Sequence, residues 1–123
     1  ASHPFVSRVG HPLLESHPSH ALAKRLLPRG AGSVFSFDIR GSRAQGRAFV
    51  DALQVFSHLA NVGDCRSLVI HPASTTHFRM SDEALAAGGI GQGTIRLSIG
   101  LEEADDLIDD LQRALKLAEK AGA

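Results

Sequence analysis

Residues 94–99 read Thr94-Ile95-Arg96-Leu97-Ser98-Ile99, a strict alternation of polar and apolar side chains. Successive side chains of a β-strand point to opposite faces of a sheet, so the three apolar residues share one face and Arg96 lies on the other. The pattern therefore predicts a strand with one buried face and one polar face, and the two faces should have different roles.

The C-terminal stretch predicts a helix that covers the apolar face of this strand. Its acidic residues gather at the start and its basic residues near the end, which suits the helix dipole. Apolar residues recur at three- and four-residue spacing along one side: Ala104, Leu107, Ile108, Leu111, Leu115 and Ala118.

The rest of the chain predicts three more strands and three more helices. We expect strands over 5–9, 32–39 and 68–70, and helices over 16–27, 41–60 and 81–87. Phe49, Leu53, Phe56 and Ala60 supply the apolar stripe of the second helix. Short connections and a length of 123 residues favour a single α+β domain, residues 1–123, with a small, mostly antiparallel sheet and helices covering one face.

Composition narrows the class of protein. Apolar residues make up 43% of the chain and charged residues 21%, and no run approaches the roughly 20 apolar residues that span a bilayer, so we expect a globular protein without a membrane role. Acidic and basic residues balance at 13 each, which gives no field that would attract nucleic acid.

The single cysteine, Cys65, cannot form an internal disulfide, which is typical of a reducing compartment. The first residues have neither the basic nor the apolar region of a signal peptide, and we expect a cytoplasmic protein.

Arg96 is the strongest functional candidate among the residues. A guanidinium in the middle of a strand, on the face away from the helix, presents a rigid fork of donors to a carboxylate or a phosphate. A solvated surface arginine and a structural ion pair are the alternatives.

Other polar features carry weaker signals. His71 and His77 bracket a loop that would suit a metal, yet no third ligand follows at a recognisable spacing, and proline with serine and threonine usually forms a turn. Cys65 and the serines lie in no nucleophile motif. The glycine-rich run at 88–93 precedes a strand instead of a helix, which is the wrong order for a phosphate-binding loop.

Several segments together resemble the C-terminal domain of the Cys/Met metabolism PLP-dependent family. They are the motifs at 59–64, 67–77 and 93–102, followed by Asp105-Asp106-Leu107-Ile108, and the likeness extends from about Val9 to Ala118. Leu59-Ala60-Asn61, with Ala31-Gly32-Ser33-Val34-Phe35 upstream, is most similar to the O-acetylhomoserine sulfhydrylase branch.

The resemblance implies a C-terminal small domain of PLP fold type I. In that family a large domain holds pyridoxal 5′-phosphate (PLP) through a lysine, and the C-terminal domain closes over the substrate. Arg96 matches the arginine that binds the substrate carboxylate, and Asn61 matches a position that helps to orient it. Thr76, with Ser74 and Thr75, matches the loop that lines the cofactor pocket.

The resemblance also predicts what this chain lacks. Its three lysines, Lys24, Lys116 and Lys120, do not lie in the family's cofactor segment, so we expect no catalytic, cofactor-binding or metal-binding residue here. The chain would be an inactive C-terminal fragment of a transferase, with the large PLP-binding domain absent. A freestanding α+β binding or interaction module without catalysis is the alternative.

The implied parent is a homotetramer that binds PLP, an O-acetyl amino acid, and sulfide or a thiol, and works in methionine and cysteine biosynthesis. The acyl donor stays open among O-acetylhomoserine, O-acetylserine and a succinyl analogue.

Overall fold

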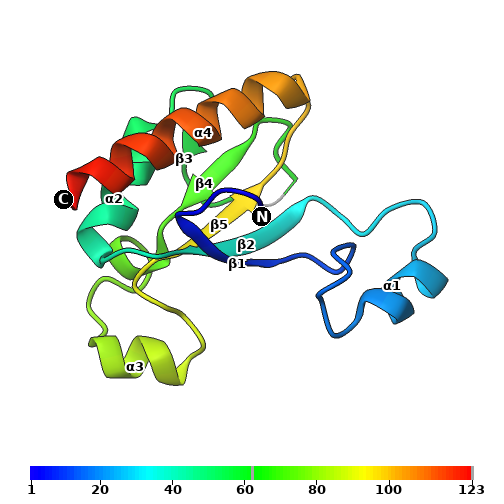
Figure 1. Ribbon diagram of the computed structural model, residues 1–123, viewed down its shortest axis with the longest axis horizontal. Helices are drawn as coiled ribbons and strands as arrows, with labels where there is room; N and C mark the ends of the chain where they lie inside the picture. Colours follow the sequence, from blue (N-terminus) through cyan, green and yellow to red (C-terminus); the bar gives the residue numbers. More distant parts are fainter. Residues whose placement is uncertain (62, 123) are drawn as a thin grey trace.

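The computed structural model describes residues 1–61 and 63–122 (Figure 1). Val62, which belongs to the family motif at 59–64, lies outside the described residues. The elements run in this order: β1 (Val6–Gly10), α1 (His20–Leu26), β2 (Val34–Ile39), α2 (Arg43–Ala52), β3 (Ser57–His58), β4 (Leu68–Ile70), the 3₁₀ turn η1 (Pro72–Ser74), α3 (Asp82–Ala87), β5 (Thr94–Ser98) and α4 (Ala104–Ala121).

The strands form one sheet in the order β1-β2-β5-β4-β3. Every pairing is antiparallel except that of β3 with β4, so the predicted α+β fold with a mostly antiparallel sheet is confirmed. β5 lies in the middle, and Arg96 is opposite Ser36 of β2 and Ile70 of β4. The alternating strand that predicted the fold is therefore the centre of the sheet.

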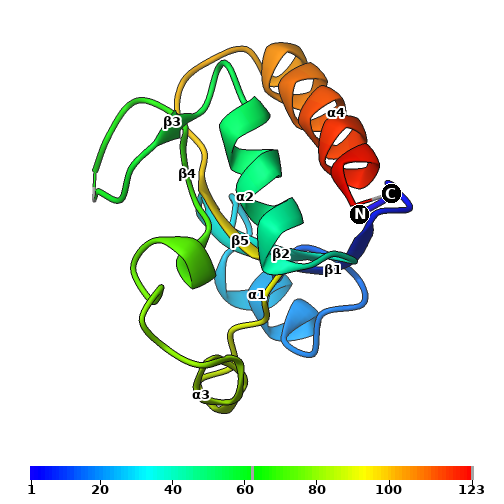
Figure 2. The same ribbon diagram turned by 90° about the vertical axis from the view of Figure 1, so that its left-hand side faces the viewer.

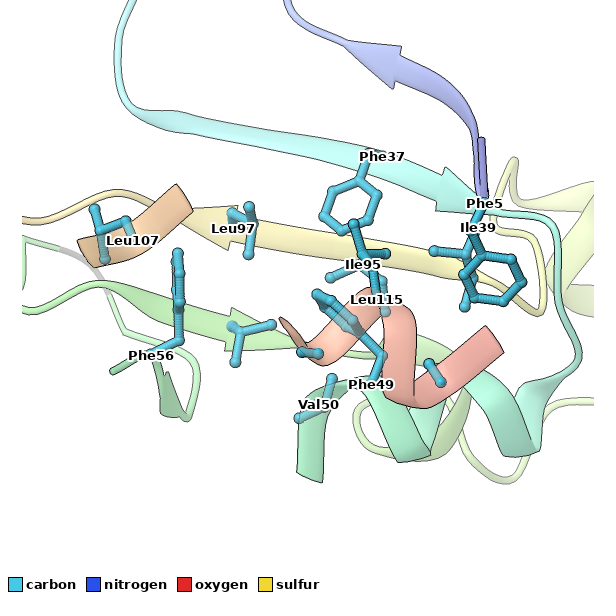
Figure 3. Close-up of a cluster of buried hydrophobic side chains, with 13 residues drawn as sticks. Phe5, Phe37, Ile39, Phe49, Val50, Phe56, Ile95, Leu97, Leu107 and Leu115 are labelled. Carbon is cyan, nitrogen blue, oxygen red and sulfur yellow. The ribbon is translucent and has the colours of Figure 1, made fainter. Parts of the chain in front are cut away.

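The hydrophobic core lies between the sheet and the helices α2 and α4, which lie side by side on one face, while α1 and α3 lie beyond the other face (Figures 1 and 2). Ile95 and Leu97 are almost completely buried beneath these helices (Figure 3). Phe37 of β2 meets Phe49 of α2 edge to face, with 5.7 Å between ring centroids. Burial of each large apolar side chain contributes about 2 kcal/mol, so this face supplies the main stabilisation of the fold.

The structure corrects the prediction of a helix over 41–60. α2 ends at Ala52, and Phe56 reaches the core from the segment beyond the helix. Ser57 and His58 then form β3, a fifth strand that was not predicted. A two-residue strand has too short a pattern to be distinguished in the sequence from the end of a helix.

The early end of α2 is explained by Asp110 of α4. Its carboxylate accepts hydrogen bonds from the backbone N–H groups of Gln54 (2.9 Å), Val55 (2.8 Å) and Phe56 (3.3 Å). Arg113 donates to the same carboxylate (2.7 Å) and to the carbonyl oxygen of Ala52 (2.6 Å). These bonds satisfy the polar groups where the helix ends, so the chain can leave the helical path without unpaired buried amides.

The carboxyl group of Asp110 is charged although only 3% of its side chain is exposed. Burial raises the pKa of Asp110. The hydrogen bonds from the amides of Gln54 and Val55 and from the guanidinium of Arg113 lower it by more, so the net pKa lies below the ordinary value.

α4 is amphipathic as predicted, but its buried stripe is rotated from the predicted one. Leu107, Leu115 and Ala118 are buried, whereas Ile108 is half exposed. Asp110 is buried although Ile108 is not, because α4 packs against the α2–β3 connection as well as against the sheet. Among the described residues, no helix is both long and apolar enough to cross a membrane.

We predict that Asp110→Ala lowers the free energy of unfolding by about 3 kcal/mol, because three backbone amides and a guanidinium lose a shared buried acceptor. Urea unfolding followed by circular dichroism measures the change. Asp109→Ala, at the neighbouring exposed position, is the matched control and should change the free energy by less than about 0.5 kcal/mol. Equal effects of the two substitutions would contradict this role of Asp110.

Candidate functional site

The polar face of the sheet carries a hollow of about 540 Å³. Arg96 lies on it, near the middle of the sheet. The side chains that line it include residues from β2, β4, the turn after β4, and β5: Ser36, Ile70, Thr76, His77, Thr94 and Arg96. The prediction that Arg96 lies on the face away from α4 is confirmed, because Arg96 is exposed while Ile95 and Leu97 are buried under the helices.

Arg96 makes no hydrogen bond or ion pair through its side chain within residues 1–61 and 63–122. Asp38, a carboxylate on the neighbouring strand β2 opposite Thr94, accepts hydrogen bonds from Thr94 (2.6 Å) and Arg8 (3.1 Å) and is thus already paired. A guanidinium stays protonated at all physiological pH values and offers five N–H donors. The hollow therefore has an uncompensated positive charge that suits a carboxylate or phosphate.

Asn61 shares a second, much smaller recess with Arg96 and Ser98. Its amide donates to Asp64 (3.4 Å), and Asp64 also binds the side chain of Arg66 through two hydrogen bonds of 2.7 and 3.0 Å. The bonds from Arg66 hold the pKa of Asp64 far below its ordinary value. The loop that presents Asn61 is thus closed by a charged pair at its base.

Glu102, which follows β5, holds the C-terminal end of that loop at Ser67 through hydrogen bonds. Its carboxylate accepts from the backbone N–H and the hydroxyl of Ser67, both at 2.7 Å, and Ser67 in turn accepts from the N–H of Gly100 (2.8 Å). The hydroxyl bond from Ser67 is the largest cause of a lowered pKa at Glu102. A Cβ atom at Gly100 would lie 2.6 Å from the backbone nitrogen of Ser67, so only glycine fits this approach.

Ser74 and Thr75 point toward His71. The Ser74 hydroxyl lies 2.8 Å from Nδ1 of the His71 ring, and the Thr75 hydroxyl donates to the carbonyl oxygen of His71 (2.9 Å). Thr76 follows them and lines the hollow, with its hydroxyl 2.7 Å from Nδ1 of His77.

The structure thus brings together some of the five predicted substrate-binding residues. Arg96 and Thr76 line the hollow, and Asn61 and Arg96 line the adjoining recess. Ser74 and Thr75 line neither of these two in the described structure, and their hydroxyl groups bond to His71 instead.

The sequence analysis named no role for Ser36 or Thr94 and considered His77 only as a weak metal-ligand candidate, and all three line the hollow. Strand alternation already places Ser36 and Thr94 on the Arg96 face, so that signal was present. The position of His77 depends on the turn after β4, which no periodic pattern describes.

The described residues hold no group of three His, Cys, Asp or Glu side chains that could bind a metal ion. Lys24, Lys116 and Lys120 are exposed on α1 and α4, and none of them lines the hollow. The hollow offers a cation for an anionic ligand but no amine for a carbonyl cofactor.

The sequence profile of the Cys/Met metabolism PLP-dependent enzymes matches residues 1–116. Homocysteine synthase of Schizosaccharomyces pombe is 47% identical over 116 residues, which cover 94% of this chain and 27% of that protein.

Two solved structures share the fold. Cystathionine gamma synthase from Xanthomonas oryzae pv. oryzae, in complex with cystathionine, superposes with a TM-score of 0.83 and 47% identity over 97% of this chain and 30% of that one. A putative O-acetylhomoserine (thiol)-lyase from Campylobacter jejuni, whose structure contains a pyridoxyl-lysine phosphate, superposes with a TM-score of 0.82 and 45% identity. The match covers 94% of this chain and 27% of that one. The chain thus spans less than a third of the length of these relatives.

The stability of the chain should depend on pH through His71. Burial is the main cause that lowers the pKa of His71, and the nearby positive charge of Arg43 lowers it further, so the folded state holds this ring neutral. The unfolded chain binds a proton at His71 near pH 6.5, and the folded chain binds it only at lower pH. The free energy of unfolding should therefore fall as the pH falls below about 6.5.

Urea unfolding between pH 8 and 5 measures this dependence, and comparison with His71→Gln isolates the contribution of the ring. We expect a shallower fall with pH in the variant. Identical slopes would show that His71 titrates alike in the folded and unfolded states.

Proposed function

The chain belongs to the Cys/Met metabolism PLP-dependent enzyme family, and we propose that it is the substrate-carboxylate-binding C-terminal domain of an O-acetylhomoserine (thiol) sulfhydrylase. The observation that carries the proposal is Arg96, a guanidinium that is unpaired among the described residues, lies on the middle strand of the sheet and lines a hollow on its polar face. The parent enzyme would replace the acetoxy group of its substrate with sulfide or a thiol.

Arg96 would bind the α-carboxylate of the amino acid through two parallel N–H···O bonds. Asn61, in the adjoining recess, would help to orient the carboxylate, and Thr76 would line the pocket that holds it. Fixing the carboxylate in this way sets the orientation of the bonds that react, which lowers the entropic part of the barrier. Arg96 moves no proton, because it stays charged.

PLP would be bound outside this chain, since no lysine lines the hollow. When bound, the cofactor supplies an electron sink for carbanions formed at the substrate. This chain's residues bind and orient the amino acid and cover the site from one side. We therefore propose that residues 1–123 form one domain of a longer enzyme and are inactive alone.

The relatives support the choice of reaction within the family. One is a homocysteine synthase and another a putative O-acetylhomoserine (thiol)-lyase, and both match more than nine-tenths of this chain. We also propose a homotetrameric parent in the cytoplasm, in keeping with the free, exposed thiol of Cys65.

We predict that Arg96→Ala in the full-length enzyme lowers kcat/KM for O-acetyl-L-homoserine by about 30- to 150-fold, because the loss of a charge-assisted pair costs about 2 to 3 kcal/mol. Steady-state kinetics measure the change. Arg47→Ala is the matched control, since Arg47 is exposed on α2 and its contact with Asp51 is long, at 4.0 Å. An unchanged kcat/KM in Arg96→Ala would refute the assignment.

A second prediction concerns the cofactor. The 123-residue chain, mixed with PLP and passed through a desalting column, should retain no stoichiometric PLP absorbance, because its lysines are exposed and lie outside the hollow. The full-length enzyme, treated in the same way, should retain one PLP per subunit. Retention of one equivalent by the short chain would mean that it contains a complete cofactor site.

A further inference from the structure

His71 is a completely buried titratable side chain next to the site, on the side of the sheet that α2 covers. It has no exposed surface and lies directly after β4, next to Ile70, which is paired with Arg96. Both ring nitrogens have partners: Nε2 lies 2.6 Å from the carbonyl oxygen of Gln92, and Nδ1 lies 2.8 Å from the hydroxyl of Ser74. The ring therefore joins the end of β4 to the segment that enters β5.

The partners determine where the proton of the ring lies. A carbonyl oxygen only accepts hydrogen bonds, so Nε2 carries the proton and donates to Gln92. In a neutral ring Nδ1 then accepts from the Ser74 hydroxyl. The charged and titratable groups that act on the ring, Arg43 of α2 and His58 of β3, add to the effect of burial and keep its pKa low. Arg43 is itself paired with Asp82 of α3 at 2.7 Å.

Gly46 of α2 provides the space for the ring. A Cβ atom at this position would overlap the imidazole and would lie 2.7 Å from its Cε1 atom. Glycine in the middle of a helix costs about 1 kcal/mol relative to alanine, so its presence here needs a reason. The close packing of the His71 ring against the α2 backbone supplies that reason.

The turn that follows is built on the same residue. The carbonyl oxygen of His71 accepts from the backbone N–H of Ser74 (3.0 Å) and from the Thr75 hydroxyl (2.9 Å). Arg43 donates to the carbonyl oxygen of Ala73 (2.9 Å), which holds the turn against α2. Thr76 and His77, which line the hollow, come next in the chain, and the N–H of His77 donates to Pro72 (2.8 Å).

We infer that His71 is a positioning residue of the site, whose neutral ring fixes the side of the hollow formed by Thr76 and His77 relative to the strand that carries Arg96. The inference rests on the proposed function. His71 does not line the hollow in the described structure, so it acts through the turn and through the Gln92–Thr94 segment. Its loss should therefore weaken capture of the amino acid more than it slows the later chemical steps.

The test compares variants of the full-length enzyme with O-acetyl-L-homoserine as substrate. We expect His71→Ala to raise KM about tenfold with kcat within about twofold of wild type. His71→Gln, which keeps an N–H donor for Gln92, should rescue part of the increase. Ser74→Ala leaves the ring in place and removes the partner of Nδ1, so it should raise KM about threefold. Glu119→Ala, at an exposed position on α4, is the control and should leave KM unchanged.

Gly46→Ala tests the same idea without a change at His71, and Gly88→Ala is its control, because a Cβ atom at Gly88 would meet its neighbours at 3.5 Å or more. Gly46→Ala should raise KM, and Gly88→Ala should not. Retained PLP and circular dichroism identify the folded variants, and Ser74→Ala replaces any variant that does not fold.

A spectroscopic readout is independent of activity. The ¹H–¹⁵N spectrum of the imidazole rings in the 123-residue chain should show His71 as a neutral ring protonated at Nε2, and Ser74→Ala should shift its Nδ1 resonance. Folded His71 and Ser74 variants with unchanged KM, or a His71 ring protonated at Nδ1, would overturn the inference. If instead the wild-type enzyme shows no sulfhydrylase activity, or Arg96→Ala leaves kcat/KM unchanged, the proposed function fails. The spectrum then still tests the position of the proton on the His71 ring.

Discussion

The fold depends on the two-faced central strand β5. Ile95 and Leu97 must be buried, and α2 and α4 cover the face on which they lie. Because alternate side chains of a strand point in opposite directions, burial of these two residues forces Arg96 onto the opposite face. β2 and β4 flank β5, so the charge lies in the middle of the sheet and away from its edges. The same pattern that makes the core therefore places the candidate ligand-binding cation.

Buried polar groups fix the segments around this framework. Asp110 determines where α2 ends, Glu102 and Ser67 hold the loop that carries Asn61, and His71 organises the turn before Thr76. Each of these groups has its hydrogen-bonding partners, as the low dielectric of a protein interior requires. His71 precedes the turn that carries Thr76 and His77, which line the hollow, and Ser67 precedes Leu68, which lines the adjoining recess.

Under the proposed function, the hollow would form one half of the substrate site. Asp38 is already paired with Arg8 and Thr94, which leaves the guanidinium of Arg96 available for an anion. The lysines lie elsewhere on the surface, and the chain spans 27% of the homocysteine synthase that it resembles. A cation without a nearby amine is what a substrate-binding domain needs when the cofactor is bound by another part of the enzyme.

The sequence by itself determined the central strand, the three other strands with clear patterns, the amphipathic C-terminal helix, the face of Arg96 and the family, since each depends on local periodicity or on a contiguous motif. Only the tertiary structure decided where α2 ends, because Asp110 acts on residues more than 50 positions away. It also decided that Ser74 and Thr75 bond to His71 while Thr76 and His77 line the hollow. Side-chain direction in a non-repeating turn follows from its packing partners, and those come together only when the chain is folded.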